Sequence, residues 1–179
     1  KVTEAAMVQL KKHCPKCKCV LLGREIGLPA YEELLQQYKD TKRLDLRDEL
    51  FAKITAKGLM EIIDMCPEPE AVFTRPDSKI EEQAMAELSV KKTSIRCLML
   101  GREITAEKYI EMEAQLKDNN VLDLRSGADF ELLSDAGIAE VIRMPGLKDT
   151  LEAVFTDPAN DKVTEAAMVQ LKKHCPKCK

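Results

Sequence analysis

The sequence predicts an α/β fold, a solenoid with a parallel sheet on its concave side and helices on its convex side. A helical pattern of apolar residues recurs seven times along the chain. A short β-like run begins 18 residues after the start of each pattern that is followed by a strand, except the last, where the distance is 21. The chain also repeats itself at two length scales. A single β–α unit cannot bury its apolar face alone, so such units are expected to stack.

The longest repeat is an identity between the two ends of the chain. Residues 1–18 read KVTEAAMVQLKKHCPKCK, and residues 162–179 read the same. The chain therefore comprises one 161-residue period, 1–161, and the start of the next, 162–179. The identity reflects either a natural tandem array or an engineered duplication. Because the period is itself built from older repeats, and because the chain starts at Lys1 without an initiator methionine, we expect it to be cut from a longer array.

The older repeats divide the period into two sub-repeats, about 19–96 and 97–161. Three segments recur between them at an offset close to 80 residues: CVLLGREI (19–26) as CLMLGREI (97–104), LDLR (44–47) as LDLR (122–125), and EAVFT (70–74) as EAVFT (152–156).

Seven helices are predicted from apolar residues that recur five and eight positions after each start, which form one stripe on a 3.6-residue helix. The predicted starts are Val2, Ile26, Ile54, Ile80, Ile104, Leu133 and Val163. A hydroxyl side chain follows five of these starts, as expected of N-caps. These residues are Thr3, Thr55, Thr105, Ser134 and Thr164.

Six strands are predicted, each with two inward residues separated by one position. The pairs are Val20 and Leu22, Leu44 and Leu46, Val72 and Thr74, Leu98 and Leu100, Leu122 and Leu124, and Val154 and Thr156. The helix-to-strand distance is nearly constant, whereas the strand-to-helix distance varies. The second connection is therefore expected to be a surface loop.

The pattern resembles the leucine-rich repeat family, most closely its ribonuclease-inhibitor-like and cysteine-containing subclasses. The match lies in the strand-then-helix spacing and in a Cys-Pro pair at helix ends, at Cys14–Pro15, Cys66–Pro67 and Cys175–Pro176. The asparagine that follows the strand in that family is missing here. The resemblance implies 1–179 as a single solenoid that presents a surface to protein partners.

Four large apolar residues flank the inward positions and are expected on the concave face, where they would bind a partner. They are Leu21, Phe73, Met99 and Phe155. Large exposed apolar patches usually mark interaction sites. The alternative is a register shift by one residue, which would place all four in the core.

A zinc site is the sharpest chemical candidate. His13, Cys14, Cys17 and Cys19 include the C-x-x-C spacing of a zinc half-site. They lie too close together in sequence to surround one ion easily. The favoured interpretation is that the cysteines are small core residues, with Cys17 equivalent to Ile95 and Cys14 equivalent to Cys66.

Composition narrows the function. The net charge of -3 argues against a nucleic-acid partner, and no apolar run is long enough to span a membrane. Seven cysteines without a targeting segment favour a reducing, cytoplasmic location. No nucleotide-binding or nucleophile motif is present, so we predict no catalytic residues and no cofactor.

We therefore expect a non-enzymatic structural spacer associated with the cytoskeleton. Its partners would be proteins or neighbouring repeats of the same chain, joined head to tail. The alternatives are a protein-binding adaptor that uses the concave face, and a zinc-binding module.

Overall fold

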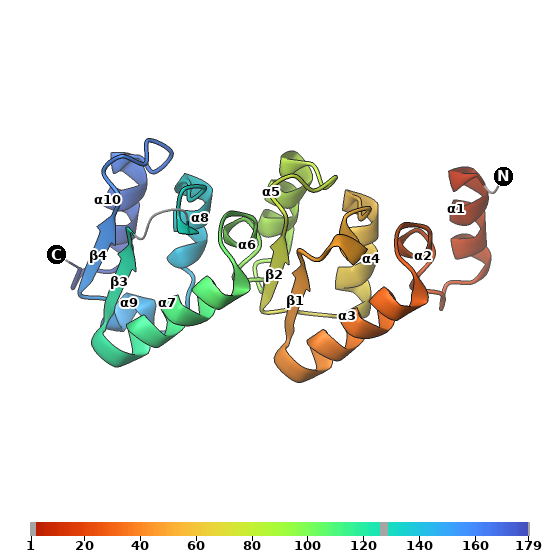
Figure 1. Cartoon of the computed structure of the whole chain (residues 1–179), viewed down its shortest axis with the longest axis horizontal. Coiled ribbons are helices and arrows are strands. Elements are labelled where there is room, and N and C mark those ends of the chain that lie inside the picture. The colour runs from red at the N-terminus through yellow and green to blue at the C-terminus, as the bar shows by residue number, and fades with distance from the viewer. Residues whose placement is uncertain (1–2, 126–128, 179) are drawn as a thin grey trace. The chain divides into compact units, whose positions relative to one another are not determined.

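The computed structural model describes residues 3–125 and 129–178. Contacts between Cα atoms divide the chain into two compact units, Lys1–Ile95 and Arg96–Lys179. Both units contain, in the same order, a short helix, a long helix, a strand, a further helix, a second strand and a final helix (Figure 1). The boundary between the units falls beside residue 97, where the sequence predicts the second sub-repeat to begin.

The first unit contains these elements: α1 (Glu4–His13), α2 (Leu22–Glu25), α3 (Leu28–Thr41), β1 (Arg43–Leu46), the 3-10 helix η1 (Glu49–Phe51), α4 (Ala56–Met65), β2 (Ala71–Thr74) and α5 (Glu82–Lys91). The second unit contains these: α6 (Leu100–Glu103), α7 (Ala106–Asn119), β3 (Val121–Leu124), α8 (Asp135–Val141), α9 (Leu147–Thr150), β4 (Ala153–Thr156) and α10 (Glu165–His174).

All seven predicted helices are present, and each begins two residues after its predicted start. The five predicted N-caps are confirmed: Thr3, Thr55, Thr105, Ser134 and Thr164. Four of these side chains accept a hydrogen bond from a backbone N–H in the first turn of their helix. Thr55 does not, because its hydroxyl donates to Glu25 instead.

The strands pair in parallel within each unit. β1 lies beside β2 with Leu44 opposite Val72, and β3 lies beside β4 with Leu122 opposite Val154. A helix connects the two strands of each pair, as parallel pairing requires. The inward residues Leu44 and Leu122 are fully buried, as predicted.

The predicted leucine-rich-repeat-like solenoid with a parallel sheet along one side is wrong. Within the described residues, the strands form two separate sheets of two strands each, and helices predominate. The predicted strands at 20–22 and 98–100 instead lead into the short helices α2 and α6. Their VLL and LML runs are apolar at every position, and such runs do not distinguish a strand from a buried helical turn.

Buried carboxylates explain why α2 and α6 form. Glu61 in α4 is 2% exposed, and its Oε2 atom accepts hydrogen bonds from the backbone N–H groups of Val20, Leu21 and Leu22, at 2.9, 2.9 and 3.0 Å. Glu140 in α8 accepts from the equivalent residues Leu98 and Leu100, at 2.7 and 2.9 Å. A carboxylate satisfies the unpaired N–H groups at the start of a helix and favours helix over strand.

A second pair of carboxylates acts in the opposite direction. Glu25, the last residue of α2, accepts hydrogen bonds from the backbone N–H and the hydroxyl of Thr55, at 3.0 and 2.6 Å. Glu103, the last residue of α6, accepts from the same two groups of Ser134. Each short helix therefore caps the longer helix that caps it.

Candidate interaction site formed by the duplicated segment

The duplicated segment, residues 1–18 and 162–179, occupies two different environments. Both copies form the same ten-residue helix, α1 in the N-terminal copy and α10 in the C-terminal copy. In Figure 1, α1 and α10 lie near opposite ends of the sequence colouring, in red and blue. Because the two copies have identical sequences, any difference between them comes from the residues that surround them.

One stripe of the helix carries this difference. We define the joining stripe as Ala6, Leu10, Cys14 and Cys17 in the N-terminal copy, and as Ala167, Leu171, Cys175 and Cys178 in the C-terminal copy. All four residues are exposed in the N-terminal copy, and all four are buried in the C-terminal copy. Leu10 is 45% exposed, whereas Leu171 is 1% exposed.

The surface that covers the C-terminal copy belongs to the second unit. The α10 helix packs against α8. Asp135, the first residue of α8, accepts hydrogen bonds from the backbone N–H and the hydroxyl of Thr164, both at 2.7 Å. The Asp135 N–H donates to the carbonyl of Lys162 at 3.2 Å, and the Lys162 ammonium donates to the carbonyl of Glu131 at 3.1 Å.

The far end of the C-terminal copy is also held. The Lys177 ammonium donates to the backbone carbonyl of Asp149 at 2.9 Å. The backbone of Val154, in β4, hydrogen-bonds to the Cys178 thiol. Burial raises the pKa of both Cys175 and Cys178. We call this set of groups on α8, α9, β4 and the adjoining loops the acceptor surface.

The N-terminal copy uses a different face. The Lys11 ammonium lies 3.0 Å from Glu61 Oε1 in α4. Although burial opposes it, the hydrogen bonds from the Leu22 N–H and from Lys11 lower the pKa of Glu61. The equivalent lysine of the C-terminal copy, Lys172, is exposed. The helix thus has two faces, one for the acceptor surface that precedes it and one for the unit that follows it.

The joint with the acceptor surface repeats a pattern found inside both units. Thr164 meets Asp135 as Thr55 meets Glu25 and as Ser134 meets Glu103, in each case through a backbone N–H and a hydroxyl on one carboxylate. Sequence analysis identified these hydroxyl residues as N-caps but missed the carboxylates. The signal available was an acidic residue about 30 positions before each N-cap.

The four predicted partner-binding residues do not form one surface. Phe73 and Met99 are buried, at 1% and 7% exposure, so their predicted exposure is wrong. Leu21 is half-buried, and only Phe155, at 43%, is exposed. The Arg125 guanidinium lies over the Phe155 ring, 4.6 Å from its centroid. Both faces of β2 are covered, whereas β4 is less covered, and this separates Phe73 from Phe155.

The predicted zinc ligands are not assembled into a site. No cluster of three or more His, Cys, Asp or Glu side chains that could hold a metal occurs in 3–125 or 129–178. Cys14 and Cys17 are exposed, and the Cys17 thiol lies 3.9 Å from the Cys19 carbonyl. His13 ends α1 and is exposed. The core-cysteine alternative describes the C-terminal copy, Cys66 and Cys97, but not the N-terminal copy.

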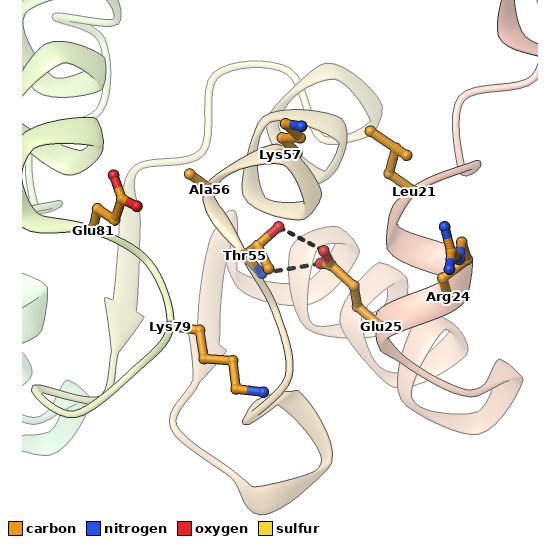
Figure 2. Close-up of a pocket in the computed structure, with 8 residues that line it drawn as sticks. All are labelled: Leu21, Arg24, Glu25, Thr55, Ala56, Lys57, Lys79 and Glu81. Atoms are coloured by element: carbon orange, nitrogen blue, oxygen red, sulfur yellow. Dashed lines mark hydrogen bonds between the residues drawn. The ribbon is translucent and has the colours of Figure 1, made fainter. Parts of the chain in front are cut away.

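A hollow of about 550 Å³ in the first unit is lined by charged side chains (Figure 2). Arg24, Lys57 and Lys79 contribute positive charge from three different segments. The carboxylate of Glu25 points to Thr55 and is engaged by its two hydrogen bonds. A carboxylate held in this way is not available as a general base. The chemistry of this hollow is therefore that of the α4 cap.

None of the helices in the described residues is long and apolar enough to cross a bilayer. No protein-family model matches the chain, and no curated protein or solved structure matches it. The proposals that follow therefore rest on the duplicated segment and on the contacts that each copy makes.

Proposed function

We propose that the chain is a non-enzymatic structural module of a tandem-repeat protein, in which the first 18 residues of each 161-residue period complete the period before it. The observation that carries this proposal is the contrast between the two copies. The joining stripe is exposed where no period precedes it and buried where one does. One helix would thus belong to two successive periods, through its two faces.

A spacer is the function that such an arrangement serves best. Each joint buries an apolar stripe and adds the hydrogen bonds between Thr164 and Asp135, so successive periods would be connected by packing rather than by a flexible linker. The cysteines are present as thiols, which suits a reducing compartment such as the cytoplasm. A cytoskeletal setting is where a length-setting array would be useful.

The adaptor alternative has weaker support. Two of its four residues, Phe73 and Met99, are buried and offer no surface to a partner. Phe155 is exposed, but the duplicated segment supplies a reason that involves no other protein, since the strand that carries it lies beside the place where a following period would begin.

A chain with two periods in tandem, ending in the C-terminal copy, tests the proposal. The cysteines of the internal copy should be protected from thiol reagents to the same extent as Cys175 and Cys178 of the single-period chain. The maximum dimension in small-angle X-ray scattering should grow by a constant increment with each added period. Internal cysteines as reactive as Cys14 and Cys17 would overturn the joint, and a dimension that does not grow would overturn the spacer.

A further inference from the structure

We infer that the C-terminal copy is a cap that the N-terminal copy of a second molecule can replace, so that molecules of this chain join head to tail. The inference rests on the joint proposed above, but it concerns separate molecules rather than periods of one chain. The occupant is a second copy of this chain, and the acceptor surface is the one that α10 covers.

The acceptor surface cannot distinguish the two copies by sequence. The groups that hold the C-terminal copy bind Lys162, Thr164 and Lys177. Each has an identical counterpart, and the counterparts are Lys1, Thr3 and Lys16. The stripe residues buried against the second unit are matched in the same way, Leu171 by Leu10 and Cys175 by Cys14. A second molecule therefore offers every side chain that the acceptor surface recognises.

The N-terminal copy is also accessible while it remains attached to its own unit. Its contact with that unit runs through Lys11 and Glu61, on a different face from the joining stripe. Leu10 is 45% exposed, and Cys14 and Cys17 are exposed. Docking would therefore bury the stripe without removing α1 from Glu61.

Tethering explains which copy wins in the intact chain. The C-terminal copy is joined to β4 by the short segment 157–164, and a short tether of this kind gives an effective concentration on the order of millimolar. A second molecule at micromolar concentration has the same side chains without the tether. The intact chain should therefore remain capped and monomeric, and it should associate when the cap is weakened.

Three full-length variants test the inference by sedimentation velocity at micromolar concentration. L171D places a charge at a 1% exposed position of the cap, so it should open the acceptor surface and give concentration-dependent oligomers. L10D makes the same change at the exposed position, and it should remain monomeric because its cap is intact. The double variant L10D/L171D has an open acceptor surface but a damaged stripe, and it should also remain monomeric.

A peptide with the sequence of residues 1–18 separates the possible outcomes. It should bind one-to-one to L10D/L171D and dissolve the oligomers of L171D. If L171D stays monomeric while the peptide binds L10D/L171D, head-to-tail association is overturned and the joint of the proposed function stands. If the peptide also fails to bind, both are overturned. Equal aggregation of L171D and L10D/L171D would overturn the inference, because the joining stripe would then play no part.

A milder pair of variants guards against simple unfolding of L171D. T164V removes the hydroxyl that donates to Asp135 at 2.7 Å and leaves the apolar stripe intact. T3V is its matched control in the N-terminal copy. T164V should associate at lower concentration than T3V and the wild-type chain, and identical behaviour of all three would overturn the inference.

Discussion

Glu25 and Glu61 cap each other's helices. Glu25, at the end of α2, accepts two hydrogen bonds from Thr55 at the start of α4, and Glu61, within α4, accepts hydrogen bonds from backbone N–H groups at the start of α2, including that of Leu22 at 3.0 Å. Glu103 and Glu140 repeat the arrangement in the second unit. Each short helix is thus stabilised by a reciprocal pair of carboxylates rather than by its own length, which at four residues is too short for independent stability.

Replacement of Glu61 by glutamine should destabilise the first unit by about 1 to 3 kcal/mol, because charged hydrogen bonds to three buried N–H groups become neutral ones. Chemical denaturation followed by circular dichroism measures the change. E32Q, at an exposed position of α3, is the matched control and should leave the free energy of unfolding unchanged within about 0.5 kcal/mol. An E61Q chain as stable as E32Q would contradict the role of Glu61 as a cap.

The same carboxylate predicts a pH dependence. The pKa of Glu61 in the folded chain lies below its ordinary value of 4.5, so the ionised carboxylate stabilises the fold at pH values above 4.5. That contribution is lost as the pH falls through the lowered pKa. The difference in the free energy of unfolding between wild type and E61Q should therefore be constant near neutral pH and shrink in acid. A difference that widens in acid would mean that the pKa is raised instead.

Gly58 leaves the space that the Glu25 carboxylate fills. A Cβ atom at residue 58 would lie 1.9 Å from Glu25 Oε2, so G58A must displace the carboxylate from Thr55. We expect a cost of about 1 to 3 kcal/mol. G23A is the control, because its Cβ would meet only the Cys19 sulfur at 3.7 Å. In an E25A background the cost of G58A should fall, and full additivity of the two changes would count against this explanation.

The sequence predicts the long helices of this fold well and the short ones poorly. The spacing around Leu34 or Leu59 forms a stripe that only a helix can bury on one side. The runs before Gly23 and Gly101 are apolar throughout, so their periodicity carries no information. Their conformation depends on Glu61 and Glu140, which lie about 40 residues away in sequence.

The candidate site shows a similar limit. The helical pattern correctly assigns residues such as Leu10 to an apolar stripe, but it assigns Leu171 to the same stripe with the same weight. Only the structure shows that one is exposed and the other buried, because the cover comes from α8, which precedes α10 in the chain and has no counterpart before α1. The expected row of Phe73 and Met99 fails because a single strand does not reveal whether its second face is covered.

The two copies of the joining stripe should respond differently to the same truncation. L171A removes a side chain that is 1% exposed and should cost about 2 to 5 kcal/mol, whereas L10A removes one that is 45% exposed and should cost less than about 1 kcal/mol. The comparison holds the local sequence constant, so helix propensity cancels. Hydrogen exchange should locate the loss for L171A in α10 and α8. Equal costs for the two variants would show that the stripe is not buried in the C-terminal copy.

Thiol chemistry provides the most direct test of the contrast between the copies. Cys14 and Cys17 are exposed, whereas Cys175 and Cys178 are buried, and burial raises the pKa of the latter two. Because the thiolate is the reactive species, the N-terminal pair should be alkylated at least about tenfold faster at pH 8. The two copies yield the same proteolytic peptides, so the rates must be measured on C14S/C17S and on C175S/C178S separately. Equal rates in the two double variants would mean that the acceptor surface leaves the C-terminal copy uncovered.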